Sequence, residues 1–440
     1  MATKRLSLEQ RLTAGKKLRR SISRSDQGDW RASKGRTQAV KTMLHHDRGR
    51  VETLLPIKYT RMAASPFGFF RGAAAVMARD MAGLPRSGLN VQLCGDAHVL
   101  NLGAFASPEG HLVFDINDFD ETMPGPWEWD IKRLASSFVV AGRQAGCSDK
   151  RCLDAVAVLV STYRNSLMRF AAMPFLDLVR HEIRRVAAAS PVRTILQKAV
   201  RETPAKNLQK LTVPSRGGRR RIATRRPVLW HLDDSSAKPV LDSLEMYRES
   251  LGPERQLLFD AYHPVDVGMK VVGTGSVGLR DYIVLMTGIG AGDPLFVQVK
   301  EEPRSCYARY LPRMRFGNQG RRVATGQHRM QTVTDPLLGW TRIGHADYLV
   351  RQLADHKAGI DPADLGGTIL ADYAAVCGEL FARAHARTGD AAALAGYCGR
   401  ADTLDRALGR FAIAYADQTT ADYELFIKQV KAGRIKTLGM

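Results

Sequence analysis

The apolar pattern of this chain changes twice along its length, and that order restricts the folds it can adopt. Apolar residues recur at helical spacing in five segments, over residues 130–143, 153–168, 175–189, 367–386 and 401–431. Short runs rich in valine, isoleucine and leucine, separated by glycines, predict strands over 267–300 and again over 340–353. The pattern therefore predicts an α+β protein in which a small sheet interrupts a helical body.

With 440 residues the chain is long enough for more than one core. We expect five parts in chain order. They are a basic helical or flexible arm (1–53), a helical lobe (54–192), a basic flexible insertion (193–226), a small β-rich lobe (227–356) and C-terminal helices that complete the helical lobe (357–440).

The net charge of +21 is concentrated in two segments. Residues 1–50 hold 14 lysines and arginines against 4 acidic residues, and residues 193–226 hold 11 against one. Such segments either bind polyanions without specificity through phosphate contacts or act as solvated, mobile arms. Because residues 216–226 contain no aromatic side chain, base stacking is not expected there.

Two classes of protein are excluded by what the sequence lacks. No apolar run approaches the roughly 18–20 residues that span a bilayer, and no apolar stretch follows the charged first residues as in a signal peptide. The six cysteines form no CxxC pair and no metal-ligand spacing. We therefore expect no membrane span, reduced thiols and a cytoplasmic location.

The most informative stretch is CGDAHVLNLGAF, followed by LVFDINDFDE. Asp96 and Asn101 lie on a predicted loop that leaves an apolar strand, and Asp115 comes fourteen residues later, directly behind a second one. Two carboxylates and an amide oxygen are the groups that phosphoryl transfer with Mg²⁺ requires. The alternative is that Asp96 and Asn101 cap turns and that residues 115–120 form a solvated acidic turn. Asp118 and Asp120 are less favoured ligands.

A glycine motif, GxGxxG, is formed by Gly273, Gly275 and Gly278, with Ser276 inside it. A dinucleotide-binding fingerprint must be followed by a helix, but residues 280–287 predict a strand. A strand on each side of the loop is the arrangement in which backbone amides cover nucleotide phosphates in kinases.

These motifs resemble those of aminoglycoside phosphotransferases and choline kinases, which are relatives of protein kinases. The resemblance covers GDxHxxN, which includes His98, then the aspartate after the apolar strand, and PGPWEWDIKRLASS. It implies that Asp96 is the catalytic base, that Asn101 and Asp115 bind Mg²⁺, and that Asp130 holds the catalytic loop.

The same resemblance extends to LFVQVK, whose Lys300 takes the place of the lysine that bridges the ATP phosphates. In ordinary kinases the glycine loop and this lysine precede the catalytic loop, whereas here they follow it. We therefore expect a two-lobed, protein-kinase-like α+β fold that is circularly permuted.

The chain also resembles a bacterial family known as a domain of unknown function. The likeness spans most of residues 55–420 and rests on SPFGFFRG, GDAHVLNLG, FDINDFDETMPGPWEWD, VGTGSVGLRDY and AHARTGD. That label implies no activity, so the expected function depends on the kinase-like motifs.

One feature departs from the kinase pattern. The helix expected after Lys300 should offer a glutamate to it, but residues 315–333 contain no acidic residue. Gln319 or Gln327, or alternatively the glutamates at 301 and 302, are the candidates to replace it. Three further basic residues, Lys58, Arg61 and Arg71, are either surface charges or ligands of an anionic substrate.

The sequence thus predicts an ATP- and Mg²⁺-dependent phosphotransferase that acts on a hydroxyl of a small molecule. Nucleotidyl transfer is not excluded by it. The alternative is a protein without catalysis, either a nucleotide-binding pseudokinase or a polyanion-binding protein that uses residues 1–50 and 193–226. The missing helix glutamate favours the alternative, and the Asp96, Asn101 and Asp115 set favours the enzyme.

Overall fold

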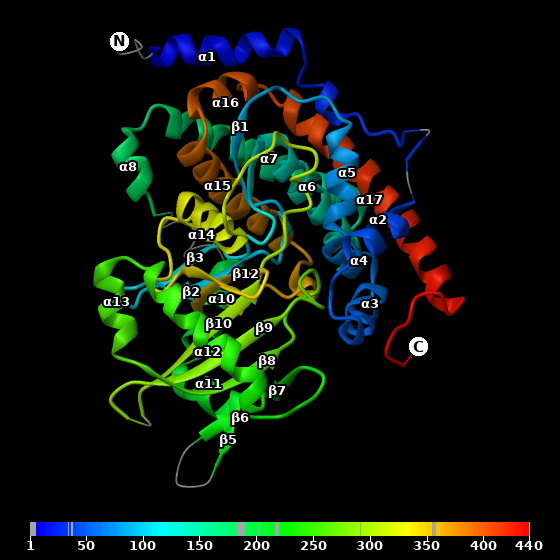
Figure 1. Cartoon of the computed structure of the whole chain (residues 1–440). Helices are drawn as coiled ribbons and strands as arrows, with labels where there is room; N and C mark the ends of the chain where they lie inside the picture. The colour runs from blue at the N-terminus through cyan, green and yellow to red at the C-terminus, as the bar shows by residue number, and fades with distance from the viewer. Residues whose placement is uncertain are drawn as a thin grey trace.

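The computed structural model describes residues 6–33, 35–36, 38–182, 190–201, 203–215, 220–290, 292–353 and 358–439. It is a mixed α+β structure, about half helix, with small antiparallel sheets (Figure 1). The largest sheet lies at one end of the molecule, and the long helices form the other end (Figure 1).

The α-helices are α1 (Leu8–Lys17), α2 (Ala39–His46), α3 (Leu55–Ala63), α4 (Pro66–Gly72), α5 (Ala74–Ala82), α6 (Trp127–Gln144), α7 (Asp149–Ala171), α8 (Phe175–Arg180), α10 (Ser190–Val200), α11 (Pro204–Leu211), α12 (Asp234–Glu249), α13 (Pro253–Asp260), α14 (Gln319–Met330), α15 (Ile369–Thr388), α16 (Ala391–Cys398) and α17 (Thr403–Lys431). Short 3-10 turns are η1 (Leu18–Arg20), η2 (Asp26–Gly28), η3 (Glu52–Leu54) and η5 (Pro362–Asp364).

The strands are β1 (Asn90–Leu93), β2 (Leu102–Ala106), β3 (Leu112–Ile116), β4 (Met123–Pro126), β5 (Thr212–Pro214), β6 (Arg220–Ile222), β7 (Leu229–His231), β8 (His263–Lys270), β9 (Asp281–Thr287), β10 (Pro294–Glu301), β11 (Gly339–Ile343), β12 (Ala346–Gln352) and β13 (Ala358–Gly359). The six-stranded sheet has the order β11-β12-β10-β9-β8-β7, and the three-stranded sheet has the order β13-β2-β3. Two-stranded sheets pair β1 with β4 and β5 with β6.

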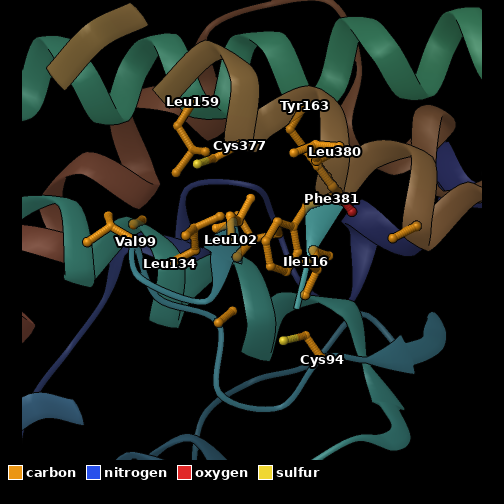
Figure 2. Close-up of a cluster of buried hydrophobic side chains, with 14 of the residues drawn as sticks. Cys94, Val99, Leu102, Ile116, Leu134, Leu159, Tyr163, Cys377, Leu380 and Phe381 are labelled. Atoms are coloured by element: carbon orange, nitrogen blue, oxygen red, sulfur yellow. The ribbon is translucent and has the colours of Figure 1, made fainter. Parts of the chain in front are cut away.

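The larger core lies among α6, α7, α15 and α17 and extends under the loop between β1 and β2. Helices α7 and α15 pack along each other because both carry apolar residues at helical spacing. Figure 2 shows how this core reaches the loop: Val99 and Leu102 lie near Leu134, and Phe381 lies near Ile116. The loop that carries Asp96 therefore rests on a fully buried apolar base.

A second core lies between the six-stranded sheet and α12. Val240, Leu244 and Tyr247 of α12 are buried with Val284 and Val297 of the neighbouring strands β9 and β10. Because side chains alternate along a strand, Lys300 at the end of β10 points to the face opposite to that of Val297 and Val299.

Helix α14 connects the sheet to the helical body. A Cβ atom at Gly320 would lie 2.0 Å from the Tyr348 oxygen of β12, and one at Gly326 would lie 2.4 Å from Thr122. Glycine at both positions therefore lets the helix touch the sheet on one side and the turn before β4 on the other. This contact fixes the sheet relative to the acidic turn at 118–121.

Most of the predicted helices and strands are present, with three differences. The sequence predicts a loop followed by one helix over residues 54–81, but the structure has three short helices there, because Ser65 and Pro66 start a new helix at α4. The predicted helix over 175–189 ends at Arg180, and residues 183–189 lie outside the described residues.

The third difference concerns the two basic segments. In the predicted flexible insertion the structure has α10 and α11, and Val192, Ile195 and Ala199 of α10 are buried. Residues 202 and 216–219 of this segment lie outside the described residues. In the arm, which was expected to be helical or flexible, α1 is a helix that packs against α16.

Two expectations from composition can be compared directly. No helix among the described residues is long and apolar enough to cross a membrane. All six cysteines are unpaired and buried.

Candidate functional site

The loop between β1 and β2 is held by the aspartate near the start of α6. Asp130 accepts hydrogen bonds from the backbone N–H groups of Cys94 at 2.7 Å and Gly95 at 2.9 Å. Gly95 has a positive φ of 92°, and a Cβ atom there would lie 2.3 Å from the Glu121 oxygen. Only glycine fits this position, which brings the loop close to the acidic turn.

A buried histidine supports Asp130 from behind. The Nε2 of His385, on α15, lies 3.3 Å from the Asp130 carboxylate, and its Nδ1 lies 2.8 Å from the Tyr163 hydroxyl of α7. In the sequence, His385 stands out only as part of AHARTGD, one of the segments that carry the family likeness. Its contact with Asp130 joins segments more than 200 residues apart, so no local pattern could reveal it.

Asp96 is ion-paired with Arg133 of α6. The Arg133 Nε donates to Asp96 Oδ1 at 2.6 Å, and the Asp96 side chain is 18% exposed. Burial raises the pKa of Asp96 above its usual value, although Arg133 opposes this effect. The side-chain nitrogen of Asn101 donates to the Asp96 carbonyl at 2.5 Å, which leaves the Asn101 amide oxygen as an acceptor.

His98 is a buried member of the same loop. Its Nδ1 accepts a hydrogen bond from the Leu100 N–H at 3.1 Å, and its Nε2 lies 3.8 Å from Asp96 Oδ2. Burial, together with Arg71 and Arg133, lowers the pKa of His98 well below its ordinary value. The neutral ring therefore carries its proton on Nε2, toward Asp96.

Asp115 lies apart from Asp96 and Asn101. Its carboxylate is ion-paired with Arg383 of α15, with Nη2–Oδ distances of 2.5 and 2.6 Å, and also accepts from the Ile116 N–H. The sequence places Asp115 directly behind an apolar strand. In the structure β3 continues to Ile116, so the Asp115 side chain belongs to the strand and is buried. The pairing with Arg383 could not be foreseen because that residue lies 268 positions away.

The carboxylates that face the loop belong to the turn after β3. Asp118 is 42% exposed, and its Oδ1 lies 4.0 Å from the Lys300 Nζ. Asp120 forms an ion pair with Lys300 through both oxygens. Burial and the neighbouring Asp120 raise the pKa of Asp118; burial would also raise that of Asp120, but Lys300 outweighs it and lowers the pKa of Asp120.

Lys300 is almost fully buried at the end of β10. Burial by itself would lower its pKa, but Asp120 and Asp118 raise the pKa above the usual lysine value. The ammonium is therefore charged and held by the acidic turn rather than by a glutamate on α14.

Of the four residues considered as partners of Lys300, three form hydrogen bonds with other groups. Gln319 accepts from Arg322, and Gln327 donates to Gln331. Glu301 bonds to Arg280 instead. Glu302, which is 2% exposed, has no hydrogen bond on either carboxyl oxygen among the described residues, and burial and Asp120 raise its pKa.

Helix α14 contributes an arginine where the kinase pattern has a glutamate. Arg322 donates to the backbone oxygens of Asp120 at 2.9 Å, Thr122 at 2.8 Å and Pro303 at 3.0 Å. Arg322 is 1% exposed, and its hydrogen bonds go to these oxygens and to Gln319. Arg322 therefore fixes the turn that holds Lys300.

The carbonyl groups of the glycine loop are bonded to the helical body. Arg50 donates to the oxygens of Gly275 and Val277, both at 2.7 Å, and Arg61 donates to the oxygen of Gly273. The Val51 N–H donates to the Gly278 oxygen at 2.7 Å. These bonds hold the loop, which lies between β8 and β9, against residues 50–61.

The same bonds determine which backbone groups remain free. The N–H groups of residues 273–276 have no acceptor among the described residues. Successive free N–H groups on a tight loop form a concave site for an anion. With its carbonyls engaged elsewhere, the loop presents donors to the space beside it.

That space is a narrow pocket of about 60 Å³ between the two parts of the molecule. Its walls come from the loop between β1 and β2, the acidic turn, the glycine loop and the basic segment that precedes β1. They include Asp96, His98, Asn101, Asp118, Asp120, Gly273, Gly275, Ser276, Arg50 and Arg71. Asp115, Asp130, Gly278 and Lys300 do not line it.

A larger pocket of about 620 Å³ adjoins the narrow one. Asn117 and Val272 line the larger pocket, while the next residues in the chain, Asp118 and Gly273, line the narrow one. The remaining walls of the larger pocket include Phe105 of β2. Its volume lies within the range of small-molecule sites.

No group of three or more histidine, cysteine, aspartate or glutamate side chains in the described part of the chain is arranged to hold a metal ion. A cation held by Asn101 and Asp118 would therefore need further oxygen ligands from a bound molecule. Mg²⁺ is commonly bound in this way, by one or two carboxylates together with phosphates. The half-exposed carboxylate of Asp118 and the amide oxygen of Asn101 fit that requirement.

Comparison with known proteins supplies the family. A profile described as an uncharacterized protein conserved in bacteria, DUF2252, matches residues 50–429. The chain belongs to the DUF2252 family. The match includes every site residue named above and all residues that line the two pockets except His46, and it begins after most of the basic arm. No curated protein and no solved structure matches the chain.

Proposed function

We propose that this DUF2252 member is an ATP- and Mg²⁺-dependent phosphotransferase with a circularly permuted, kinase-like arrangement. The observation that carries this proposal is the narrow pocket, in which the catalytic loop, the acidic turn and the free N–H groups of the glycine loop meet. These segments are far apart in the chain, so their meeting is a property of the fold.

The two adjoining pockets would hold different parts of the nucleotide. The base and ribose occupy the larger pocket, and the phosphates extend past Val272 and Asn117 into the narrow one. The N–H groups of residues 273–276 bind the phosphates. Lys300 lies behind the pocket wall and holds Asp120, which lines the pocket. When bound, Mg²⁺ neutralises phosphate charge, and Asn101 and Asp118 are the residues that would hold it.

This assignment replaces Asp115 by Asp118 as the metal ligand. Asp115 is buried, and Arg383 occupies its carboxylate, whereas Asp118 lines the pocket and is 42% exposed. Asp115 instead becomes a structural residue that joins β3 to α15.

The chain's own groups account for the proton. The oxygen of the acceptor hydroxyl attacks the terminal phosphorus, the bond from phosphorus to the bridging oxygen breaks, and ADP leaves with that electron pair. Asp96 accepts the hydroxyl proton; its raised pKa makes it a stronger base than an ordinary aspartate. A small acceptor is proposed because the space beside Asp96 is confined.

A second candidate is nucleotide binding without transfer. The observation that favours it is the ion pair between Asp96 and Arg133, which stabilises the carboxylate that would otherwise accept a proton. The two candidates share the binding site and differ only in turnover.

The test is calorimetric titration of ATP with and without Mg²⁺ into the full chain and into Asp118→Asn and Asp115→Asn. Binding that requires Mg²⁺ in the wild type, is lost in Asp118→Asn and is retained in folded Asp115→Asn supports the proposal. Absence of nucleotide binding by the wild type contradicts both candidates. Formation of ADP rather than AMP and pyrophosphate, with a panel of hydroxyl compounds, then separates phosphoryl from nucleotidyl transfer and from binding alone.

A further inference from the structure

Arg71, near the end of α4, is a cation in the narrow pocket whose side chain has no role in the arrangement described so far. The other basic residues there are engaged. Arg50 is bound to Asp47 and to two carbonyls of the glycine loop, and burial lowers the pKa of His46, which lies 3.9 Å from Glu121. Arg71 makes no hydrogen bond and no ion pair with any described residue.

The surroundings of Arg71 are acidic but do not touch it. It lines the pocket together with Asp96 and Asp118, which both act on its charge from beyond contact distance. Its Nε is fully buried without an acceptor. Burial lowers the pKa of Arg71, and the two carboxylates only partly oppose this effect.

The fold fixes the backbone from which the Arg71 side chain extends. Ser65 caps α4 by accepting from the Gly68 N–H, and Phe67, Phe69 and Phe70 on the same helix are buried. The glycine loop approaches the helix so closely that a Cβ atom at Gly275 would lie 3.5 Å from the Arg71 oxygen. Arg71 is thus set between the glycine loop and the catalytic loop.

The Arg71 side chain is partly buried, and its Nε is fully buried without an acceptor, which costs free energy that a bound anion would recover. Its planar array of donors fits two oxygens of one phosphoryl group better than a point charge does. Asp96 and Asp118 line the same pocket, so they repel an anion that brings its own cation, as a nucleotide complexed with Mg²⁺ does, less than they repel a bare anion.

We propose that Arg71 is a catalytic residue that binds the phosphoryl group in transfer, at the terminal phosphate of the nucleotide. The inference rests on the proposed function and extends it to a residue outside the catalytic, metal and glycine motifs. Arg71 neutralises charge on the non-bridging oxygens while the bond to ADP breaks, and neither gives nor takes a proton.

The test compares ligands that differ only at the terminal phosphate. Calorimetry measures the affinities of Mg²⁺-ATP, Mg²⁺-ADP, and Mg²⁺-ADP with aluminium fluoride, which imitates the phosphoryl group in transfer. The proteins are the wild-type full chain, Arg71→Gln, Arg71→Lys and Arg48→Gln. Arg48 is an exposed arginine outside the pocket, close to it in sequence, and controls for loss of a positive charge.

Arg71→Gln is expected to lower the affinity for ATP and for the aluminium fluoride complex by about 10- to 100-fold, since a hydrogen bond to a charged group contributes on that scale. The affinity for ADP should change by less than about twofold. Arg71→Lys should recover part of the loss, and Arg48→Gln should match the wild type.

Two outcomes overturn the inference. Equal losses of affinity for ADP and ATP would mean that Arg71 binds another phosphate or contributes only its positive charge to the pocket. Unchanged affinities would mean that Arg71 does not contact the nucleotide. In both cases the wild type still binds nucleotide, so the proposed function stands. Failure of the wild type to bind any nucleotide contradicts the proposed function itself and the inference with it. Arg71→Lys keeps the test decisive if Arg71→Gln does not fold.

Discussion

Lys300 on β10 is ion-paired with Asp120 in the turn after β3, although 180 residues separate them in the chain. The pair crosses from the six-stranded sheet to the loop region of the helical body, and Arg322 of α14 holds the backbone of the same turn. The acidic turn thus serves as the partner of the buried lysine in the place where a helix glutamate was expected.

Replacing Lys300 by methionine tests whether this pair belongs to the nucleotide site. We expect Mg²⁺-ATP affinity to fall by about tenfold or more, because Asp120, which lines the narrow pocket, loses the cation that neutralises it and then repels the phosphates. Calorimetry checks this, with Lys238→Met as control because Lys238 is exposed and pairs only with Asp242. An unchanged affinity in folded Lys300→Met would remove Lys300 from the phosphate site.

Asp115→Asn is expected to destabilise the protein by about 3–5 kcal/mol, because it leaves Arg383 buried without a counter-charge. Urea unfolding followed by circular dichroism measures the change in the free energy of unfolding. Asp149→Asn, at an exposed ion pair with Arg143, is the matched control and should change it by less than about 1 kcal/mol. Equal small effects of the two variants would contradict a structural role for Asp115.

Asp130→Ala should loosen the loop between β1 and β2 without removing any group from the narrow pocket. Two backbone N–H groups, those of Cys94 and Gly95, lose their acceptor, so their hydrogen exchange should accelerate by about tenfold or more, in proportion to the stability of the lost bonds. Exchange measured by mass spectrometry on peptides covering 90–101 gives the result. Protection as in the wild type would show that other contacts hold the loop.

Arg50→Gln should release the glycine loop, because Arg50 binds two of its carbonyls. Hydrogen exchange of the Val51 and Leu279 N–H groups, which donate to the loop carbonyls of Gly278 and Ser276, should accelerate. Mg²⁺-ATP affinity should fall by about fivefold to tenfold as the free N–H groups lose their common orientation. Arg48→Gln is again the control. Faster exchange with unchanged affinity would show that nucleotide binding does not need the hydrogen bonds from Arg50 to the glycine loop.

Asp281 gives a prediction for pH. Burial raises its pKa from 3.8 to about 6, with Lys300 and a hydrogen bond from Gln298 opposing the rise. Between these values the folded protein binds more protons than the unfolded chain, so this group's contribution to stability is lost as pH rises from about 4 to about 6.

Asp281→Asn should remove that loss. Relative to the wild type, the free energy of unfolding of the variant should rise by up to about 3 kcal/mol between about pH 4 and about pH 7. Urea unfolding at several pH values measures it, with Asp242→Asn as the exposed control. A difference that stays constant with pH would mean that Asp281 titrates normally.

The sequence by itself determined that a small sheet interrupts a helical body, because apolar periodicity is local. It also determined which loops carry the acidic, amide and glycine groups, since each motif is contiguous, and it led to the expectation that Asp96, Asn101 and the glycine loop act together. Their common pocket is consistent with that expectation.

Only the tertiary structure decided which carboxylate faces the pocket and which is buried. Asp115 and Asp118 are three residues apart, yet one meets Arg383 of α15 and the other lines the site. The partners of Lys300 and Asp130, Asp120 and His385, come from distant segments. Ion pairs and hydrogen bonds depend on distances of a few ångströms between such segments, and those distances are set by how the two cores pack.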